Sequence, residues 1–195
     1  LDIARIEAGQ LSLSPEPVEV REIVGHALAL VAPLARQRQI SLVTSESALA
    51  SRSVVADRQR LNQILLNLLS NAVKYNRDGG QVTVGVEQPS EHNLRINVTD
   101  TGPGIPPQKL RLLFRPFERL GAESTAIEGT GLGLTLSRGL AEAMGGTIGV
   151  VSRLDVGSTF WIELRLANET AVSPVPSAEL PTLEAADGPA ATVLY

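Results

Sequence analysis

The sequence contains no cysteine, and this absence removes several kinds of site at once. A disulfide scaffold, a thiolate zinc site and a cysteine nucleophile are all excluded. The chain has only two histidines, His26 and His92, and their distance in the sequence argues against a histidine-rich metal site. Aromatic residues make up only 3% of the chain, so the core must be built from Leu, Val, Ile and Ala.

Basic residues are also in short supply, with 17 Lys and Arg against 21 Asp and Glu and a formal net charge of -4. A broad nucleic-acid-binding surface needs a basic excess, so we expect no nucleic-acid partner. No apolar run approaches the ~20 residues that span a bilayer, and no signal peptide is visible. With 43% hydrophobic residues, the 195-residue chain predicts one folded α/β or α+β domain with appendages. We expect this domain to be cytoplasmic, whether or not the whole protein is anchored to the inner membrane.

Hydrophobic periodicity predicts three helices and a series of short strands. Helical spacing covers residues 20–38, 57–75 and 132–144, and Asp57 is the predicted N-cap of the second, strongest helix. Alternating apolar residues predict strands at residues 11–14, 40–43, 53–56, 81–87, 94–99, 147–152 and 158–166. We expect the strands at 81–87 and 94–99 to pair antiparallel. Glycine and proline mark residues 100–131 as mainly loop.

The two ends of the chain differ from its middle. Residues 1–14 read as the end of a longer helix and a connector, so we expect the chain to be a fragment. Residues 15–167 form the predicted domain. Residues 168–190 are rich in Ala, Pro, Glu and Ser without periodicity, which is typical of a linker. Residues 191–195 are a short apolar run of strand formers, either a frayed terminus or the start of a following domain.

The strongest helix carries an unusual polar face. Asn67, Asn71 and Lys74 fall within about 60° of one another, opposite the Leu/Ile stripe. A solvated face would explain such a set. However, asparagine is a poor helix former, and here two asparagines stand mid-helix at i and i+4. Tyr75, one of only six aromatic residues, ends this face.

Two glycine-rich segments follow. Asp100-Thr101-Gly102-Pro103-Gly104-Ile105 comes directly after a strand, where glycines admit a flat ligand and the carboxylate can accept a hydrogen bond from an exocyclic amine. An Asp-Gly turn would give the same pattern. Gly129-Thr130-Gly131-Leu132-Gly133-Leu134 opens a helix, whose first N–H groups favour phosphate oxygens. The segment is neither a Walker-type loop nor a dinucleotide fingerprint. Gly157-Ser158-Thr159-Phe160 leads into the last strand, and a hairpin would explain it.

These segments occur in a recognisable order. The set LNQILLNLLSNAVKY, DTGPGI, LFRPFERL, GTGLGLTLSRGLAEAMGG and GSTFWIEL resembles the ATP-binding catalytic domain of sensor histidine kinases, a member of the GHKL (Bergerat) ATPase superfamily. The resemblance covers residues from about 15 to 167, and LDIARIEAGQLSL is similar to the segment that leaves the dimerisation helix in that family.

The resemblance implies a fold, two cofactors and a set of residue roles. The fold is a two-layer α/β sandwich in which a mixed, mostly antiparallel sheet is covered on one face by three helices, and the cofactors are ATP and Mg²⁺. Asn71 would bind Mg²⁺, Asn67 and Lys74 would position metal and phosphates, and Arg119 would reach the terminal phosphate. The remaining predicted nucleotide-binding residues are Tyr75, packing on adenine, Asp100, accepting from its amino group, and Gly102, Gly104, Ile105, Phe117, Gly129, Thr130, Gly131, Leu132, Gly133, Leu134 and Thr159. Phe114 belongs to the box before a nucleotide lid, which we expect over residues 118–130, and Thr159 is expected to lie near the adenine with Asp100.

The resemblance also informs the reaction. Related ATPases of the gyrase, heat-shock chaperone and mismatch-repair kind carry a water-activating glutamate at the position of Asn67, and an amide cannot take a proton. Transfer of the γ-phosphoryl group to another nucleophile is then favoured, which in this family is a histidine of the dimerisation helices. His26 and His92 do not lie in a matching context, so we expect the phosphoacceptor before residue 1 and the fragment alone to be inactive.

We expect the partners that such a kinase implies: the dimerisation domain of the same protein, through which the full-length protein would be a homodimer, and a response-regulator receiver domain. The run at 191–195 resembles the first strand of a receiver, as in a hybrid kinase. Two alternatives stay open. One is a nucleotide-gated regulatory or clamp module of the same fold. The other is an anti-sigma-type serine kinase, for which a glutamate is expected in place of Asn67.

Overall fold

A computed structural model describes residues 11–44, 52–118 and 130–167. Three main helices are present: α2 (Val20–Gln37), α3 (Arg58–Lys74) and α5 (Gly133–Ala143). They confirm the three predicted helices to within one residue at each end. The strands are β1 (Glu16–Glu19), β2 (Ser41–Thr44), β3 (Ser53–Ala56), β4 (Gln81–Ser90), β5 (Asn93–Asp100), β6 (Thr147–Arg153) and β7 (Gly157–Arg165). No helix among the described residues is both long and apolar enough to cross a membrane.

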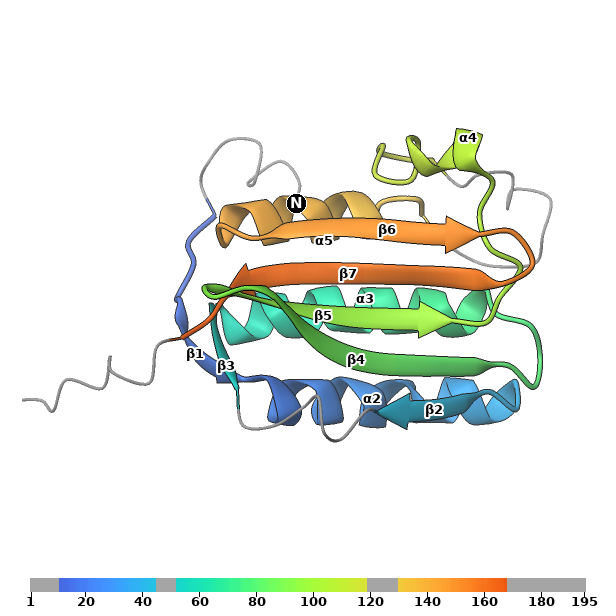
Figure 1. Ribbon diagram of the computed structural model, residues 1–195, viewed down its shortest axis with the longest axis horizontal. Helices are drawn as coiled ribbons and strands as arrows, with labels where there is room; N and C mark the ends of the chain where they lie inside the picture. Colours follow the sequence, from blue (N-terminus) through green and yellow to red (C-terminus); the bar gives the residue numbers. More distant parts are fainter. Residues whose placement is uncertain (1–10, 45–51, 119–129, 168–195) are drawn as a thin grey trace, which may run out of the picture.

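The main sheet has five strands in the order β2-β4-β5-β7-β6. β2 pairs parallel with β4, and the other three pairings are antiparallel, including the predicted β4–β5 pair. Helices α2, α3 and α5 lie side by side on one face of this sheet (Figure 1). The expected two-layer α/β sandwich is therefore confirmed.

The core lies between the sheet and the helices and is almost wholly aliphatic. Along β5 and β7 the even-numbered residues face the helices, because side chains alternate between the two faces of a strand. They meet the apolar stripe of α3, whose buried residues are Leu61, Ile64, Leu65, Leu68, Leu69, Ala72 and Val73. Phe160 is the one aromatic residue in the core of the described segments. The aliphatic core that the low aromatic content of the sequence predicts is therefore confirmed.

One prediction about a short element was wrong. Residues 11–14 are not a strand; the first strand is β1, which pairs antiparallel with β3 and places Val18 opposite Val54, both fully buried. Pro17 is tolerated because β1 belongs to a two-stranded sheet with a free edge. The predicted loop after residue 100 also contains a short helix, α4 (Pro107–Leu110), which begins with a proline at its first position.

Asp57 caps the start of α3, as predicted, and also ties the N-terminal segment to it. Its Oδ1 accepts a hydrogen bond from the Arg60 N–H at 3.1 Å, and its Oδ2 accepts one from the Ser14 N–H at 3.0 Å. Partial burial alone would raise the pKa of Asp57, but the N–H groups of Ser14, Arg60 and Gln59 together outweigh it and lower this pKa below its ordinary value.

We expect Asp57→Ala to lower the free energy of unfolding by about 1 kcal/mol at pH 7, and Asp57→Asn to lower it less, since asparagine also caps helices. A carboxylate whose pKa is lower in the folded state stabilises the fold above its unfolded pKa, and this contribution is lost as the pH falls through the folded pKa. Urea unfolding at several pH values should therefore show the difference between wild type and Asp57→Ala shrinking in acid. A difference that does not depend on pH would contradict this role.

Candidate functional site

A cavity of about 900 Å³ opens at the end of the sheet where β5 and the β6–β7 hairpin meet α3 and α5. Polar and charged side chains line much of it. From α3 and the loop after it come Asn67, Ser70, Asn71, Lys74, Tyr75, Asn76 and Arg77; from other elements come Arg38, Asp100, Pro103, Gly104, Ile105, Pro106, Lys109, Leu113, Glu118, Thr130, Gly131, Gly133, Leu134, Asp155, Ser158 and Phe160. Residues from most of the length of the domain thus meet in this one place.

The polar face of α3 forms one wall, directly opposite the stripe that fills the core. Asn67 donates through Nδ2 to the Ser137 hydroxyl of α5 at 2.8 Å, and Asn71 donates through Nδ2 to Asn67 Oδ1 at 3.5 Å. In the described segments no hydrogen bond engages Asn71 Oδ1. That oxygen is a suitable ligand for Mg²⁺, which takes few protein ligands and completes its shell with water and phosphate oxygens. The donor set therefore fits the implied metal, with Asn71 as the residue that would hold it.

The start of α5 closes against this wall. A Cβ at Gly133 would overlap the Asn67 side-chain oxygen, so glycine at this position lets the Asn67 amide lie against the first turn of α5. No side chain of the described residues caps the helix at Leu132, which leaves its first backbone N–H groups available to a ligand. Thr130, Gly131, Gly133 and Leu134 line the cavity beside these groups. This end of the cavity can bind an anion through a helix N-terminus.

Asp100 lies at the opposite side, at the end of β5, and is only 7% exposed. Its Oδ1 accepts hydrogen bonds from the Gly102 N–H at 2.8 Å and the Ser158 N–H at 3.3 Å. Burial is the largest influence and raises the pKa of Asp100, against the opposing effects of these two N–H groups and of Arg77. Because both bonds use Oδ1, Oδ2 is free to accept a hydrogen bond from a ligand in the cavity.

Thr159 does not lie where the sequence analysis placed it. Its hydroxyl bonds the Thr99 hydroxyl at 2.9 Å on the face of the sheet away from the helices, and it does not line the cavity. Ser158 is the residue opposite Asp100 in the β5–β7 register, and it is buried beside it. The prediction was wrong by one residue, and in a strand one residue moves a side chain to the other face.

The loop after Asp100 is held in place by close backbone contacts. Gly104 has φ +71°, and a Cβ there would overlap the Arg153 carbonyl at the tip of the β6–β7 hairpin. Ile105 lines the cavity, and its N–H donates to the Ser152 hydroxyl at 2.8 Å. Gly102 does not line the cavity, and its N–H donates to Asp100 Oδ1. The glycine spacing of this segment therefore serves packing against the hairpin as well as access for a ligand.

The other predicted residues either line the cavity, lie outside its lining, or fall outside the described residues. Tyr75 lines the cavity and is 40% exposed at the C-cap of α3. Phe117 and Leu132 lie near it but do not line it, and Phe114 packs against the core instead. Phe117 is 72% exposed with φ +63°, and its N–H donates to the Gly131 carbonyl at 3.1 Å. Arg119, Gly129 and most of the predicted lid lie outside the described residues.

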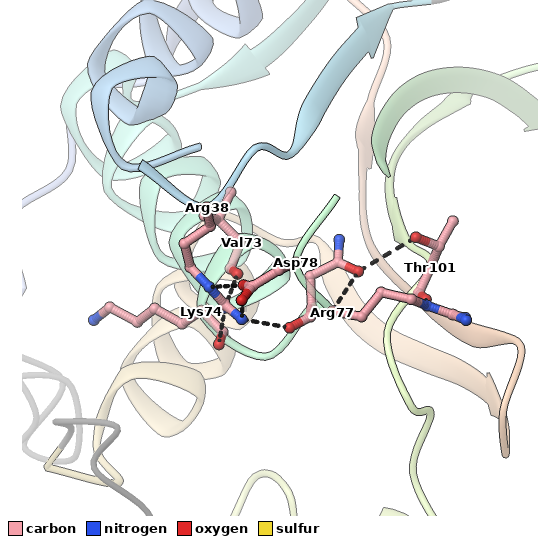
Figure 2. Close-up of polar contacts among 7 residues, drawn as sticks. Arg38, Val73, Lys74, Arg77, Asp78 and Thr101 are labelled. Atoms are coloured by element: carbon pink, nitrogen blue, oxygen red, sulfur yellow. Dashed lines mark hydrogen bonds and ion pairs between the residues drawn. The ribbon is translucent and has the colours of Figure 1, made fainter. Parts of the chain in front are cut away.

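Two arginines of the site were not predicted. Arg38 binds the last carbonyls of α3, and Arg77 donates to the Thr101 carbonyl (Figure 2). Arg77 also donates to the Asp155 carbonyl at 3.4 Å. Asn76, 5% exposed between them, accepts from the Arg77 N–H and the Thr101 hydroxyl. No motif marks these positions, because their partners are backbone carbonyls that become neighbours only in the fold. Ser158, by contrast, follows from strand alternation once Asp100 is placed.

The sandwich, the buried carboxylate and the amide face define a nucleotide-binding domain with an anion-binding helix end. The profile of the family described as "Histidine kinase-, DNA gyrase B-, and HSP90-like ATPase" matches residues 56–168. The chain belongs to this family of ATP-binding domains.

Sensor histidine kinases are among its similar relatives. The sensor histidine kinase GacS of Pseudomonas protegens is 42% identical over 170 residues, which cover 85% of this chain and 18% of GacS. The virulence sensor protein BvgS of Bordetella bronchiseptica is 39% identical over 170 residues, or 85% of this chain and 14% of BvgS. The chain thus spans less than a fifth of the length of these curated relatives.

A solved structure gives the same result. The full-length ShkA crystal structure in complex with AMPPNP is 32% identical with a TM-score of 0.73, over 86% of this chain and 34% of that chain. The chain is therefore homologous to the catalytic, ATP-binding part of sensor histidine kinases.

Burial of Asp100 predicts that replacing this carboxylate by an amide changes the stability of the fold in a way that depends on pH. A carboxylate whose pKa is raised on folding favours the fold below its unfolded pKa, and this advantage is lost as the pH rises through the folded pKa. Asp100→Asn stays neutral and keeps an acceptor oxygen, so we expect it to unfold at the same or higher urea concentration than wild type at pH 7. Its relative stability should fall as the pH is lowered towards 4. A loss of stability that is equal at pH 4 and pH 7 would contradict this prediction.

Proposed function

We propose that the chain is the catalytic domain of a sensor protein-histidine kinase and transfers the γ-phosphoryl group of Mg-ATP to a histidine of a dimerisation domain. The observation that carries this proposal is the wall of α3 that faces the cavity. It presents Asn67, Ser70, Asn71, Lys74 and Tyr75, and none of these side chains is a general base for water at neutral pH. A nucleotide held against such a wall is disposed to react with a nucleophile brought by a partner.

The residues divide the work between the two ends of the nucleotide. Asp100 Oδ2 accepts from the adenine amino group, and Tyr75 packs on the ring. Asn71 Oδ1 would hold Mg²⁺, with Asn67 beside it, and Lys74 and the start of α5 would face the phosphates. When bound, the metal would supply positive charge beside the phosphate oxygens. The imidazole nitrogen of the partner then forms a bond to the γ-phosphorus as the bond to the β–γ bridging oxygen breaks, and ADP leaves.

The decisive experiment supplies the missing substrate. The chain is mixed with γ-labelled ATP and a separately produced dimerisation domain, and both the labelled partner and free phosphate are measured. We expect label on the partner that is stable in base and lost in acid, as for phosphohistidine, with little free phosphate. Release of free phosphate alone would favour a hydrolysing module instead, and then Glu118, which also lines the cavity, becomes the residue to test as its base.

We expect Asn71→Ala to lower the rate of this transfer by at least ~10²-fold, because the charge of the phosphates is no longer neutralised in place. The side chain does not contribute to the aliphatic core, so the variant should stay folded. Asn62→Ala is the matched control, since Asn62 lies on the same helix but contacts His26 away from the cavity. Transfer at near the wild-type rate, or an unfolded Asn71→Ala, would contradict the assignment.

We also expect the chain to bind ATP more tightly than GTP, by at least about tenfold, because guanine presents a carbonyl where adenine presents an amine and two acceptors would then face each other. Isothermal titration calorimetry with both nucleotides measures the ratio. In Asp100→Asn the amide can rotate to donate, so the ratio should fall. Equal affinities in the wild type would remove Asp100 from its role in adenine recognition.

We propose in addition that the phosphoryl group passes to a response-regulator receiver domain and that the full-length kinase is a homodimer through its dimerisation helices. This proposal extends to the whole chain. Residues 1–14 are then the end of the dimerisation helix and the connector, residues 168–190 are a linker, and residues 191–195 are the first strand of a receiver. Transfer of label from the phosphorylated dimerisation domain to a purified receiver aspartate would support it.

A further inference from the structure

Arg38 makes an unusual set of contacts with the end of another helix. It follows α2 directly, and its Nη1 donates to the Val73 carbonyl at 2.7 Å and the Lys74 carbonyl at 2.6 Å. Its Nη2 donates to the Asn76 carbonyl at 2.8 Å (Figure 2). Asp78 completes the set, accepting from Nε at 2.9 Å and lying 2.8 Å from Nη2. One guanidinium therefore binds the end of the helix that carries the metal- and phosphate-facing residues.

Two of these carbonyls, those of Val73 and Lys74, belong to the last turn of α3, whose C=O groups have no partners inside the helix. The last C=O groups of an α-helix point away from its end and give it a partial negative charge, and a cation there is stabilising. Arg38 supplies that cation, with donors in a planar fork that reach several acceptors at once. A lysine has its donors on a single nitrogen and cannot reproduce this pattern.

The negative helix end opens on the cavity. Lys74 and Tyr75, at the end of α3, line the cavity together with Arg38 itself. A polyphosphate bound beside such an end would be repelled by it, in contrast to the start of α5, which attracts anions. Three backbone carbonyls accept hydrogen bonds from Arg38. Its carboxylate partner, Asp78, is largely exposed, so solvent screens that ion pair more than it screens the contacts with the helix end.

The backbone of Arg38 fixes where its side chain reaches. Its carbonyl accepts a hydrogen bond from the Gly79 N–H at 3.1 Å, and the Ser41 N–H donates to the Gly80 carbonyl at 2.9 Å. The segment after α2 and the loop after α3 are thus joined by two backbone hydrogen bonds. Arg38→Gln would remove the charge and the carbonyl contacts of the guanidinium while leaving this backbone pairing in place.

We propose that Arg38 is a positioning residue for the phosphates of the nucleotide: it holds the last turn of α3 so that Lys74 faces the phosphates, and it offsets the negative helix end beside them. This inference rests on the proposed function, in that it takes the ligand of the cavity to be ATP. Arg38 does not contact the phosphates in this proposal; it acts on them through the carbonyls at the end of α3 and through the Lys74 side chain.

The test compares a charged ligand with its uncharged part. ATP and adenosine are titrated into wild type, Arg38→Gln, Arg38→Lys and Arg36→Gln, below the unfolding temperature of every variant. Arg36→Gln makes the same change of net charge at an exposed residue in the last turn of α2. We expect Arg38→Gln to weaken ATP binding about tenfold, the factor that corresponds to about 1.4 kcal/mol. Adenosine should change by less than about twofold, Arg38→Lys should lie between, and Arg36→Gln should match wild type.

The ratio of ATP to adenosine affinity is the readout that a purely structural role would not move. An equal loss for both ligands in Arg38→Gln, or an equal loss of ATP affinity in Arg36→Gln, would overturn the proposal. If Arg38→Gln does not fold, Arg38→Lys decides by the same ratio. If neither folds, Arg38 is a folding residue and the proposal is wrong. Wild type that binds no ATP would instead refute the proposed function, so the two failures are distinct.

Discussion

The structure depends on how α3 is divided between two environments. One side of this helix buries five large aliphatic side chains against the sheet, each fully or almost fully inaccessible, and burial of one such side chain contributes about 2 kcal/mol. The other side presents amides and a lysine to the cavity. Because the apolar stripe fixes the rotation of α3 about its own axis, it also fixes where Asn67, Asn71 and Lys74 point. The packing of the core is therefore the means by which the site is oriented.

The far wall of the cavity obeys a different constraint. A carboxylate on an inward-facing position of a strand would ordinarily be excluded from the core, and Asp100 is tolerated only because it stands at the last position of β5, where two backbone N–H groups reach it. Those N–H groups come from the loop that follows β5 and from the neighbouring strand β7. Gly104 allows the loop to fold tightly enough against the β6–β7 hairpin to make this arrangement. Recognition at this wall is thus obtained at a cost in stability.

Sequence reasoning reached those features that depend on periodicity or on a motif. The alternation of valines in β4 and the 3.6-residue stripe of α3 are local patterns, so the helices and most strands were placed closely. The same reasoning failed where the outcome depends on partners distant in the chain. Leu11 and Leu13 alternate as a strand would, but no strand of the described segments pairs with them, whereas Val18 pairs with Val54. Thr159 was chosen over Ser158 because the motif contains both hydroxyls, and only the register with β5 distinguishes them. Arg38 belongs to no motif, and its role became visible only when its carbonyl partners were placed.

Two helix ends of opposite sign open on the same cavity, and this explains why the site needs more cations than the nucleotide-binding motifs provide. The uncapped start of α5 lies beside Asn67 and attracts anions, while the end of α3 lies beside Lys74 and repels them. A ligand that is flat and uncharged at one end and polyanionic at the other must lie along α3, between Asp100 and the start of α5. Tyr75, which we assign to the ring, stands at the C-cap of α3, and Lys74, which we assign to the phosphates, directly precedes it. Arg38, which follows α2 and lies outside the nucleotide-binding motifs, donates to the carbonyls at this end of α3 and so places a cation there.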